Sequence, residues 1–343
     1  MTYPLRKISP LFFAPDGLRA GWALLAAVVI FFIVFQAIGY FLHLVHLAPH
    51  PQSASPTPGA VLYSEGLLFL VVAIVTWIMS RIEGRPVSTY GLGGQRRLPL
   101  LLTGAFWGLL FLSFLVLILI KANLLVVDSR LLSGSDILRY ALAWTPAFLA
   151  IAFFEEYLFR GYLLYTLTRW LTALYRRVAG PSRSASFGFW TAALLLSLGF
   201  GLIHGSNIGE SPVGQLCAAL ISIVFCLSIW RTGSLWWSIG FHAAWDWAES
   251  FLYGVADSGI TVRFHLLATH PTGSPLLSGG ATGPEGSLFA ILIAALAAAV
   301  IIFTLPDKGA YAALLPPPLS PALPDTGSLP DPVPAPWSEE RRR

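Results

Sequence analysis

Long apolar segments alternate with short polar ones along most of the chain. Windows of about 20 apolar residues, the length that an α-helix needs to cross a bilayer, recur about eight times. They lie near residues 21–47, 61–80, 99–121, 147–169, 187–205, 213–230, 234–253 and 287–305. The pattern predicts an all-α fold, a polytopic transmembrane helical bundle of about eight spans.

One apolar segment is too long for a single crossing. Helix-like sequence runs from 137 to about 174 and contains Pro146. Because a proline disrupts the interior of a helix, Pro146 is the expected break. We therefore expect residues 137–145 to form an interfacial or re-entrant piece and residues 147–169 to form the fourth span.

Composition agrees with a membrane protein. The chain has 343 residues, of which 56% are hydrophobic and 11% are charged, whereas about 25% of the residues in a soluble domain are charged. The net charge of +4 is modest, and arginines cluster in short connections between the predicted spans. This distribution is typical of topology signals and argues against nucleic acid as a partner.

Arginine placement also predicts the orientation in the bilayer. The arginines of these short connections are Arg81, Arg85, Arg96, Arg97, Arg169, Arg176, Arg177, Arg183 and Arg231. The alternate connections 48–60 and 206–212 carry no Lys or Arg. With eight spans, all the arginine-rich connections face the cytoplasm if both termini are cytoplasmic. We expect a multi-pass protein that, in a bacterial cell, resides in the plasma membrane.

The chain divides into four regions by composition. Residues 1–136 hold N-terminal transmembrane helices, and residues 137–253 hold the polar motifs described below. Residues 254–305 comprise an external loop and the last span. The loop 254–286 is rich in Gly, Ser, Thr and Pro, so we expect it to be exposed and mobile. Residues 306–343 are proline-rich and are expected to form a disordered tail.

Ionisable residues within the apolar segments are concentrated between about 150 and 250. They form three spaced motifs: Glu155-Glu156 with Arg160, Phe200 with His204, and His242 with Asp246. A charge inside a membrane costs at least a few kcal/mol, so such residues usually mark a function.

The first motif separates two adjacent glutamates. Neighbouring residues on a helix point about 100° apart, whereas Glu156 and Arg160 are four residues apart and share a face. Their pairing would leave Glu155 free to face a cavity, where a dehydrated carboxylate suits a general base. The alternative is that all three residues form a structural ion-pair network that holds helices together.

The two histidines allow both catalytic and structural interpretations. His204 ends a predicted span and, considered alone, is typical of an interfacial or hydrogen-bonded residue. Asp246 lies one turn after His242, where it could orient the imidazole or simply join helices through a polar contact. No HExxH zinc motif, GxSxG elbow, or Walker or Rossmann glycine pattern is present.

The three motifs, in this order, resemble the CPBP family of intramembrane glutamic endopeptidases. The family signature is EExxxR, then FxxxH, then HxxxN or HxxxD, on successive helices. Asn207 after the second motif and the segment 233–242 before the third also look like the family. The family includes type II CAAX prenyl proteases and bacterial proteins of bacteriocin self-immunity. The similarity covers about residues 140–250, which makes 137–253 the expected protease core.

The resemblance implies a role for each matched residue. Glu155 would activate a water for attack on a peptide carbonyl, and His204 would position that water or the glutamate. His242 and Asp246 would stabilise the oxyanion. Glu156, Arg160 and Asn207 would support the site, and neither a metal nor a cofactor would be required. Because an ionised aspartate only accepts hydrogen bonds, we expect Asp246 either to be protonated or to orient His242 while His242 donates.

Three functions from different classes follow as hypotheses. The first is an intramembrane endopeptidase that cleaves a membrane-associated protein or peptide, lipidated or not, in CAAX-type or bacteriocin processing. The second is a non-catalytic membrane scaffold or immunity protein of the same fold. The third is a proton-coupled transporter that uses the same buried groups. At about 1.5 Å per helical residue, the positions of the motifs in their spans favour a cavity that reaches the outer half of the membrane, whereas the resemblance to CAAX-processing proteases implies access from the cytoplasm. The sequence leaves both directions open.

Overall fold

A computed structural model describes residues 12–14, 17–47, 55–176, 178–307 and 309–315. The predicted disordered tail therefore lies mostly outside the described residues. The α-helices are α1 Ala20–Leu44, α2 Pro58–Glu83, α3 Arg97–Lys121, α4 Ser135–Glu155, α5 Leu164–Tyr175, α6 Pro181–His204, α7 Pro212–Thr232, α8 Trp236–Asp246, α9 Pro275–Ser278 and α10 Leu288–Thr304. Two π-helices, η3 Glu156–Leu163 and η4 Trp247–Leu252, extend α4 and α8. Short 3₁₀-helices are η2 Val87–Tyr90, η5 Pro284–Gly286 and η6 Ala312–Leu314.

The predicted all-α helical bundle is confirmed, and the protein is an integral membrane protein. Among the described residues, six helices are long and apolar enough to cross a membrane: α1, α2, α3, the continuous helix Ser135–Tyr175, α6 from Arg183, and α7. The other two predicted spans coincide with α8 plus η4 and with α10, which are shorter. Helices thus occur at all eight predicted positions, although the count of full-length spans is lower than expected.

Local sequence signals set the ends of several helices. Thr57 and Ser211 accept hydrogen bonds from the backbone amides of Ala60 and Gly214, which caps α2 and α7. A proline follows each cap at the first helical position, where its missing N–H costs nothing. Both helices end at a glycine with φ of +66°, a left-handed conformation that a residue without Cβ adopts easily.

The expected break at Pro146 is wrong. Pro146 lies inside α4, and helix continues without interruption through η3 and α5 over 41 residues. The carbonyl of Ala141, one residue before the carbonyl that Pro146 leaves without its helical partner, accepts two side-chain hydrogen bonds. That oxygen accepts from the Thr145 hydroxyl at 2.9 Å and from the Trp247 indole N–H at 3.1 Å. Side-chain donors of this kind allow a proline within a membrane helix.

The loop 254–286 also differs from its prediction, because it is folded and partly buried. Its strand β4 (Leu267–Pro271) pairs antiparallel with β3 (Leu125–Arg130), with Leu125 opposite Pro271 and Val127 opposite Thr269. The Thr269 hydroxyl donates to the Tyr253 carbonyl, which fastens the loop to the end of η4. A second small sheet pairs β1 (Phe13–Ala14) with β2 (Gly17–Leu18).

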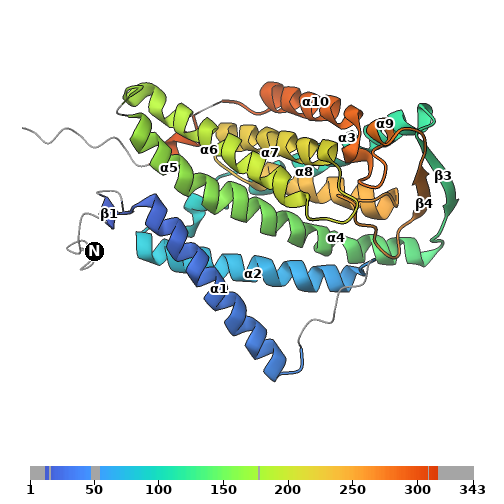
Figure 1. Cartoon of the computed structure of the whole chain (residues 1–343), viewed down its shortest axis with the longest axis horizontal. Helices are drawn as coiled ribbons and strands as arrows, with labels where there is room; N and C mark the ends of the chain where they lie inside the picture. Colours follow the sequence, from blue (N-terminus) through green and yellow to red (C-terminus); the bar gives the residue numbers. More distant parts are fainter. Residues whose placement is uncertain (1–11, 15–16, 48–54, 177, 308, 316–343) are drawn as a thin grey trace, which may run out of the picture.

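The helices lie roughly along the long axis of the molecule, with β3 and β4 at one end (Figure 1). Helix α8 is mostly buried and contacts α3, α4 and α7. By contrast, α1 crosses α2 at one side of the bundle and buries only Ala20, Ala23 and Ala27. The element that carries His242 and Asp246 is therefore held from several directions.

Glycines permit the closest of these helix contacts. A Cβ built on Gly104 of α3 would overlap the Trp237 carbonyl oxygen of α8, and one on Gly108 would overlap the Phe241 carbonyl. Gly240 of α8 faces the backbone of α3 in the same way. Small residues allow helix backbones to approach within a membrane.

We predict that Gly104→Ala destabilises the protein by about 1–3 kcal/mol, because the added methyl must push α3 away from α8. The matched control is Gly39→Ala, since a Cβ on Gly39 of α1 meets nothing within 4 Å. Unfolding of both variants by SDS in mixed micelles, followed by tryptophan fluorescence, measures the difference. Equal stability of the two variants would contradict the close-packing account of α3 and α8.

Candidate active site

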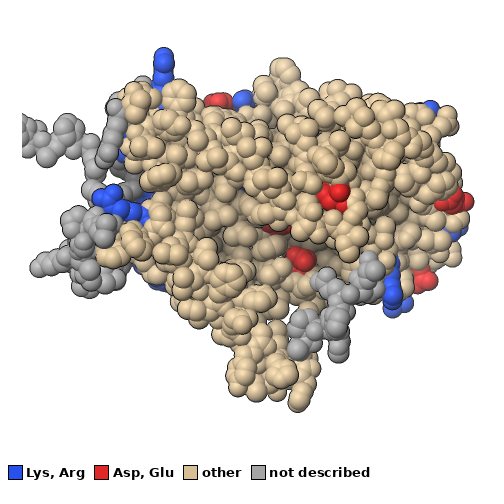
Figure 2. Space-filling view, in the orientation of Figure 1, with Lys and Arg blue, Asp and Glu red and all other residues tan. Residues whose placement is uncertain are grey.

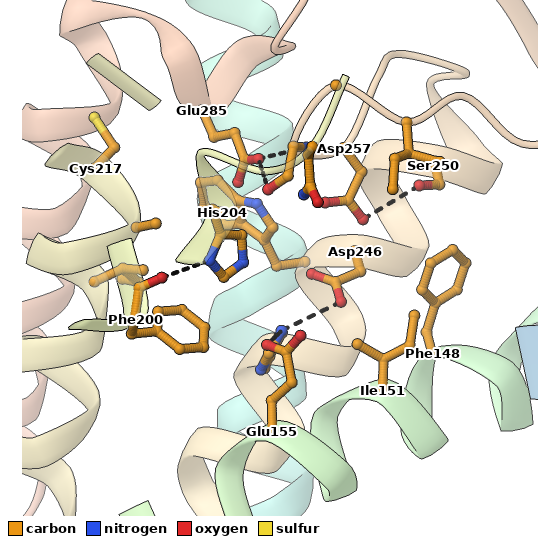
Figure 3. Close-up of a pocket in the computed structure, with 18 of the residues that line it drawn as sticks. Phe148, Ile151, Glu155, Phe200, His204, Cys217, Asp246, Ser250, Asp257 and Glu285 are labelled. Carbon is orange, nitrogen blue, oxygen red and sulfur yellow. Dashed lines mark hydrogen bonds and ion pairs between the residues drawn. The ribbon is translucent and has the colours of Figure 1, made fainter. Parts of the chain in front are cut away.

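The four predicted catalytic residues meet around one cavity of about 650 Å³. Glu155 ends α4, His204 ends α6, and His242 and Asp246 lie on α8. All four line the cavity together with Asn207, which follows α6. Figure 3 shows Glu155, His204 and Asp246 around it. Glu156 and Arg160 are not in the lining and lie buried behind it. The motifs are thus close in space although they span about ninety residues of sequence.

The π-helix η3 begins where the two glutamates diverge. Glu155 is the last residue of α4, and its side chain keeps 22% of its surface exposed to the cavity. Glu156 is the first residue of η3 and is fully buried. One of its carboxylate oxygens, Oε1, lies 2.9 Å from an Arg160 guanidinium nitrogen, as the four-residue spacing predicted. π-helical turns are rare and occur frequently at functional sites.

His242 is oriented by Glu156. The Nδ1 atom of His242 lies 3.0 Å from Glu156 Oε1, the oxygen that also accepts from Arg160. An ionised carboxylate only accepts hydrogen bonds, so Nδ1 donates. The other nitrogen, Nε2, faces the cavity, 3.4 Å from Asp246 Oδ2 and 3.7 Å from Glu155 Oε2. Sequence reasoning assigned the orienting role to Asp246, whereas Glu156 has the shorter contact and Asp246 lies at the opposite nitrogen.

His204 is oriented by its own helix. Its Nδ1 lies 2.7 Å from the Phe200 carbonyl oxygen. Because a carbonyl oxygen accepts hydrogen bonds, Nδ1 is the donor, and Nε2 takes no part in this hydrogen bond. The Phe200 ring in turn lies against Arg160, with the guanidinium carbon 4.0 Å from the ring centroid. A cation over an aromatic face is attracted by the ring quadrupole. The first and second motifs are therefore in direct contact through Arg160 and Phe200.

Connections at one end of the bundle contribute to the lining of the cavity. Its lining includes Pro56, Asn207 and Thr261, which belong to connections between helices. Pro56 and Asn207 lie in the connections that lack Lys and Arg, opposite the arginine-rich ones. In the predicted topology these two connections face outward, and the face to which the cavity opens stays a prediction. Figure 2 shows acidic side chains recessed in a hollow of a surface that is otherwise mostly uncharged.

A comparison with family models identifies the segment that contains this site. Residues 137–248 match the model described as type II CAAX prenyl endopeptidase Rce1-like. This match supports the resemblance to the CPBP and CAAX-type protease family that the three motifs indicated. No curated protein and no solved structure matches the chain. The matched segment contains all three motifs, from α4 through α8.

Several residues around the Rce1-like site were not predicted as site residues from the sequence. Glu65 of α2, Asp257 and Glu285 also line the cavity. Glu65 is an acidic residue within a strongly apolar helix, a signal that could have identified it. Asp257 and Glu285 belong to the loop that was expected to be mobile, and only the folding of that loop brings them to the site. Glu249, three residues after Asp246, is fully buried.

Proposed function

We propose that this protein is an intramembrane endopeptidase in which Glu155 activates the water that hydrolyses a peptide bond of a membrane-associated protein or peptide. The observation that carries the proposal is the approach of Glu155 to 3.7 Å from His242 Nε2 in a cavity that His204 and Asp246 share. The protease core is proposed to comprise residues 137–253, with the other helices supporting it.

The arrangement supports a general-base mechanism. Glu155 would take a proton from a water while the water oxygen bonds to the carbonyl carbon of the substrate. His204 would accept or donate a hydrogen bond that holds this water. The carbonyl oxygen would gain negative charge, and a donor already aimed at that oxygen lowers the barrier. Glu155 would then pass the proton to the departing amine nitrogen as the C–N bond breaks.

His242 is the donor best placed to receive the oxyanion. With Nδ1–H held by Glu156, a doubly protonated ring would present Nε2–H to the cavity. Asp246 would hold this N–H until substrate binds, or would donate itself when protonated. The positive charge of Arg160 would balance the negative charge of Glu156, so that the pair can stay buried.

We propose that Glu155 activates the water without a metal, as the family resemblance implies. Within the described part of the chain, one group of three His, Cys, Asp or Glu residues has ligand atoms close enough to hold an ion, namely Glu249, Asp257 and Glu285. None of these is a proposed catalytic residue. Glu155, His204 and His242 do not meet the same spacing.

The decisive experiment is peptide-bond cleavage by the purified protein in detergent. The substrates are membrane-anchored peptides offered as matched pairs, with and without a farnesyl group on a C-terminal cysteine. 1,10-Phenanthroline is added to remove Zn²⁺. Cleavage that continues with the chelator supports the proposed mechanism, and a preference within the pairs separates CAAX-type substrates from unlipidated peptides. Loss of cleavage with the chelator would favour a metalloenzyme, and failure to cleave any peptide of the pool would favour the scaffold hypothesis.

We predict that Asp246→Asn retains cleavage within about tenfold, whereas Asp246→Ala loses about 10²–10³-fold in kcat. An asparagine keeps an oxygen for His242 and adds an N–H that can donate to the oxyanion. An alanine leaves the Nε2 side of His242 without its partner at 3.4 Å. Steady-state kinetics on one peptide compare the two variants with the wild type. Equal losses in both variants would show that the negative charge of Asp246 is required.

A further inference from the structure

A second group of acidic side chains lies beside the proposed catalytic residues. Glu249 belongs to η4, three residues after Asp246, while Asp257 and Glu285 come from the loop that folds over this end of the bundle. One carboxylate oxygen from each residue lies within 4.8 Å of the other two. Figure 3 shows Asp257 and Glu285 on the side of the cavity away from Glu155. We propose that Glu249, Asp257 and Glu285 bind a divalent cation of the Ca²⁺ type.

The buried oxygen of Glu249 is an independent indication of a ligand. Glu249 is fully buried, and its Oε2 accepts from the Trp245 indole N–H at 2.8 Å. Its Oε1 has no hydrogen-bond partner among the described residues. A buried carboxylate oxygen without a partner is costly, and a cation satisfies such an oxygen directly. A Cβ on Gly283, which has a φ of +109°, would overlap the Ala256 carbonyl oxygen and would lie 3.4 Å from Glu249 Oε1, so the loop backbone approaches this oxygen closely.

Two serines donate hydrogen bonds to the carboxylates of Glu285 and Asp257. The backbone amide and the hydroxyl of Ser258 both donate to Glu285 Oε1 at 2.6 Å. The Ser250 hydroxyl donates to Asp257 Oδ2 at 3.4 Å. Each carboxylate therefore accepts a protein hydrogen bond on one oxygen, which leaves the second oxygen for an ion. Metal-binding carboxylates are commonly oriented by hydrogen bonds of this kind.

The chemistry of the donors selects a hard cation. All three groups offer oxygen, which suits Ca²⁺ or Mg²⁺ better than Zn²⁺, whose usual ligands include sulfur and nitrogen. Ligands on opposite sides of a Ca²⁺ ion, at about 2.3–2.6 Å each, are about 4.6–5.2 Å apart. The oxygen separations here fall within that limit. Ca²⁺ also tolerates an irregular set of ligands completed by waters, whereas Mg²⁺ demands a near-ideal octahedron.

The position of the group gives the ion a structural role. A bound ion would join η4 to two separate points of the loop 254–286. The π-helix η4 continues the helix that carries His242 and Asp246. The loop lines the cavity through Asp257 and Glu285, so the ion would hold the wall of the cavity in place. This inference concerns binding and stability, and it stands whether or not Glu155 activates a water.

The test uses Tb³⁺, which replaces Ca²⁺ at oxygen sites and emits when a nearby tryptophan such as Trp245 is excited. The purified protein is first stripped with EGTA and then titrated, and Ca²⁺ is added as competitor. We expect saturable emission from one site per chain, displacement by Ca²⁺, and at least about tenfold weaker binding in Glu285→Gln, which loses one charged ligand. Ca²⁺ should also raise the Tm of the wild type and not that of this variant.

The control for surface binding is Asp128→Asn, because Asp128 is an exposed carboxylate paired with His270 on the sheet of β3 and β4. It should bind Tb³⁺ as the wild type does. Should Glu285→Gln fail to fold, Asp257→Asn removes a different ligand of the same group. Absence of saturable binding in the wild type, or equal affinity in the wild type and in the folded ligand variant, would overturn the proposal.

Discussion

Glu155→Gln should lower kcat/KM for peptide-bond cleavage by about 10²–10⁴-fold, the range that a general base contributes. Glutamine has almost the same shape as glutamate, but its amide cannot take a proton from water. Glu155 is the carboxylate of the first motif that faces the cavity, since Glu156 is fully buried and pairs with Arg160. Initial rates on a peptide cleaved by the wild type measure the effect.

The matched control is Asp136→Asn, which makes the same chemical change at an exposed position in the first turn of α4. This variant should cleave at the rate of the wild type. Tryptophan fluorescence and gel filtration should show that both variants are folded. Full activity of Glu155→Gln would eliminate Glu155 as the base, and another residue of the cavity would have to activate the water.

Glu156→Gln should lower the free energy of unfolding by about 3–5 kcal/mol, the loss typical of breaking a buried ion pair by removing one partner. Arg160 is 3% exposed and would remain charged with no compensating carboxylate at 2.9 Å. The same change removes the acceptor that orients His242 Nδ1. Cleavage should therefore fall together with stability, although Glu156 does not line the cavity.

A second substitution separates the two effects of Glu156. In Glu156→Gln/Arg160→Met no uncompensated charge remains, so at least about half of the lost stability should return. Activity should stay low, because His242 still lacks its carboxylate. Stability is measured by SDS unfolding in mixed micelles at fixed lipid content. A double variant as unstable as the single one would show that Glu156 contributes through contacts other than the ion pair with Arg160.

Within the site, sequence spacing was a reliable guide to contacts along one helix. The four-residue intervals predicted the Glu156–Arg160 pair and the approach of Asp246 to His242, because helical geometry alone brings such residues together. Spacing could not reveal that Glu156 contacts His242 or that Phe200 covers Arg160. Those contacts join different helices, and they depend on how α4, α6 and α8 pack.

The predictions that failed have a common physical origin. Pro146 was expected to end a helix, yet the helix continues through it, and Trp247, about a hundred residues later, donates to the carbonyl of Ala141 in the same turn. The loop 254–286 was expected to be exposed, yet its polar residues find partners in η4, β3 and one another. In each case the structure that the local sequence favours is overridden by hydrogen-bonding groups from distant parts of the chain, which only the folded protein brings near.

The sequence alone determined the membrane-embedded helical class, the positions of the helices, and the three motifs of the Rce1-like core. Apolar length and helical spacing are local properties, and they act before any tertiary contact forms. The tertiary structure decided which oxygen each histidine faces and that α2 contributes Glu65 to the cavity. It also decided that Glu249, Asp257 and Glu285 lie together. These features depend on close packing between distant segments, which no local pattern encodes.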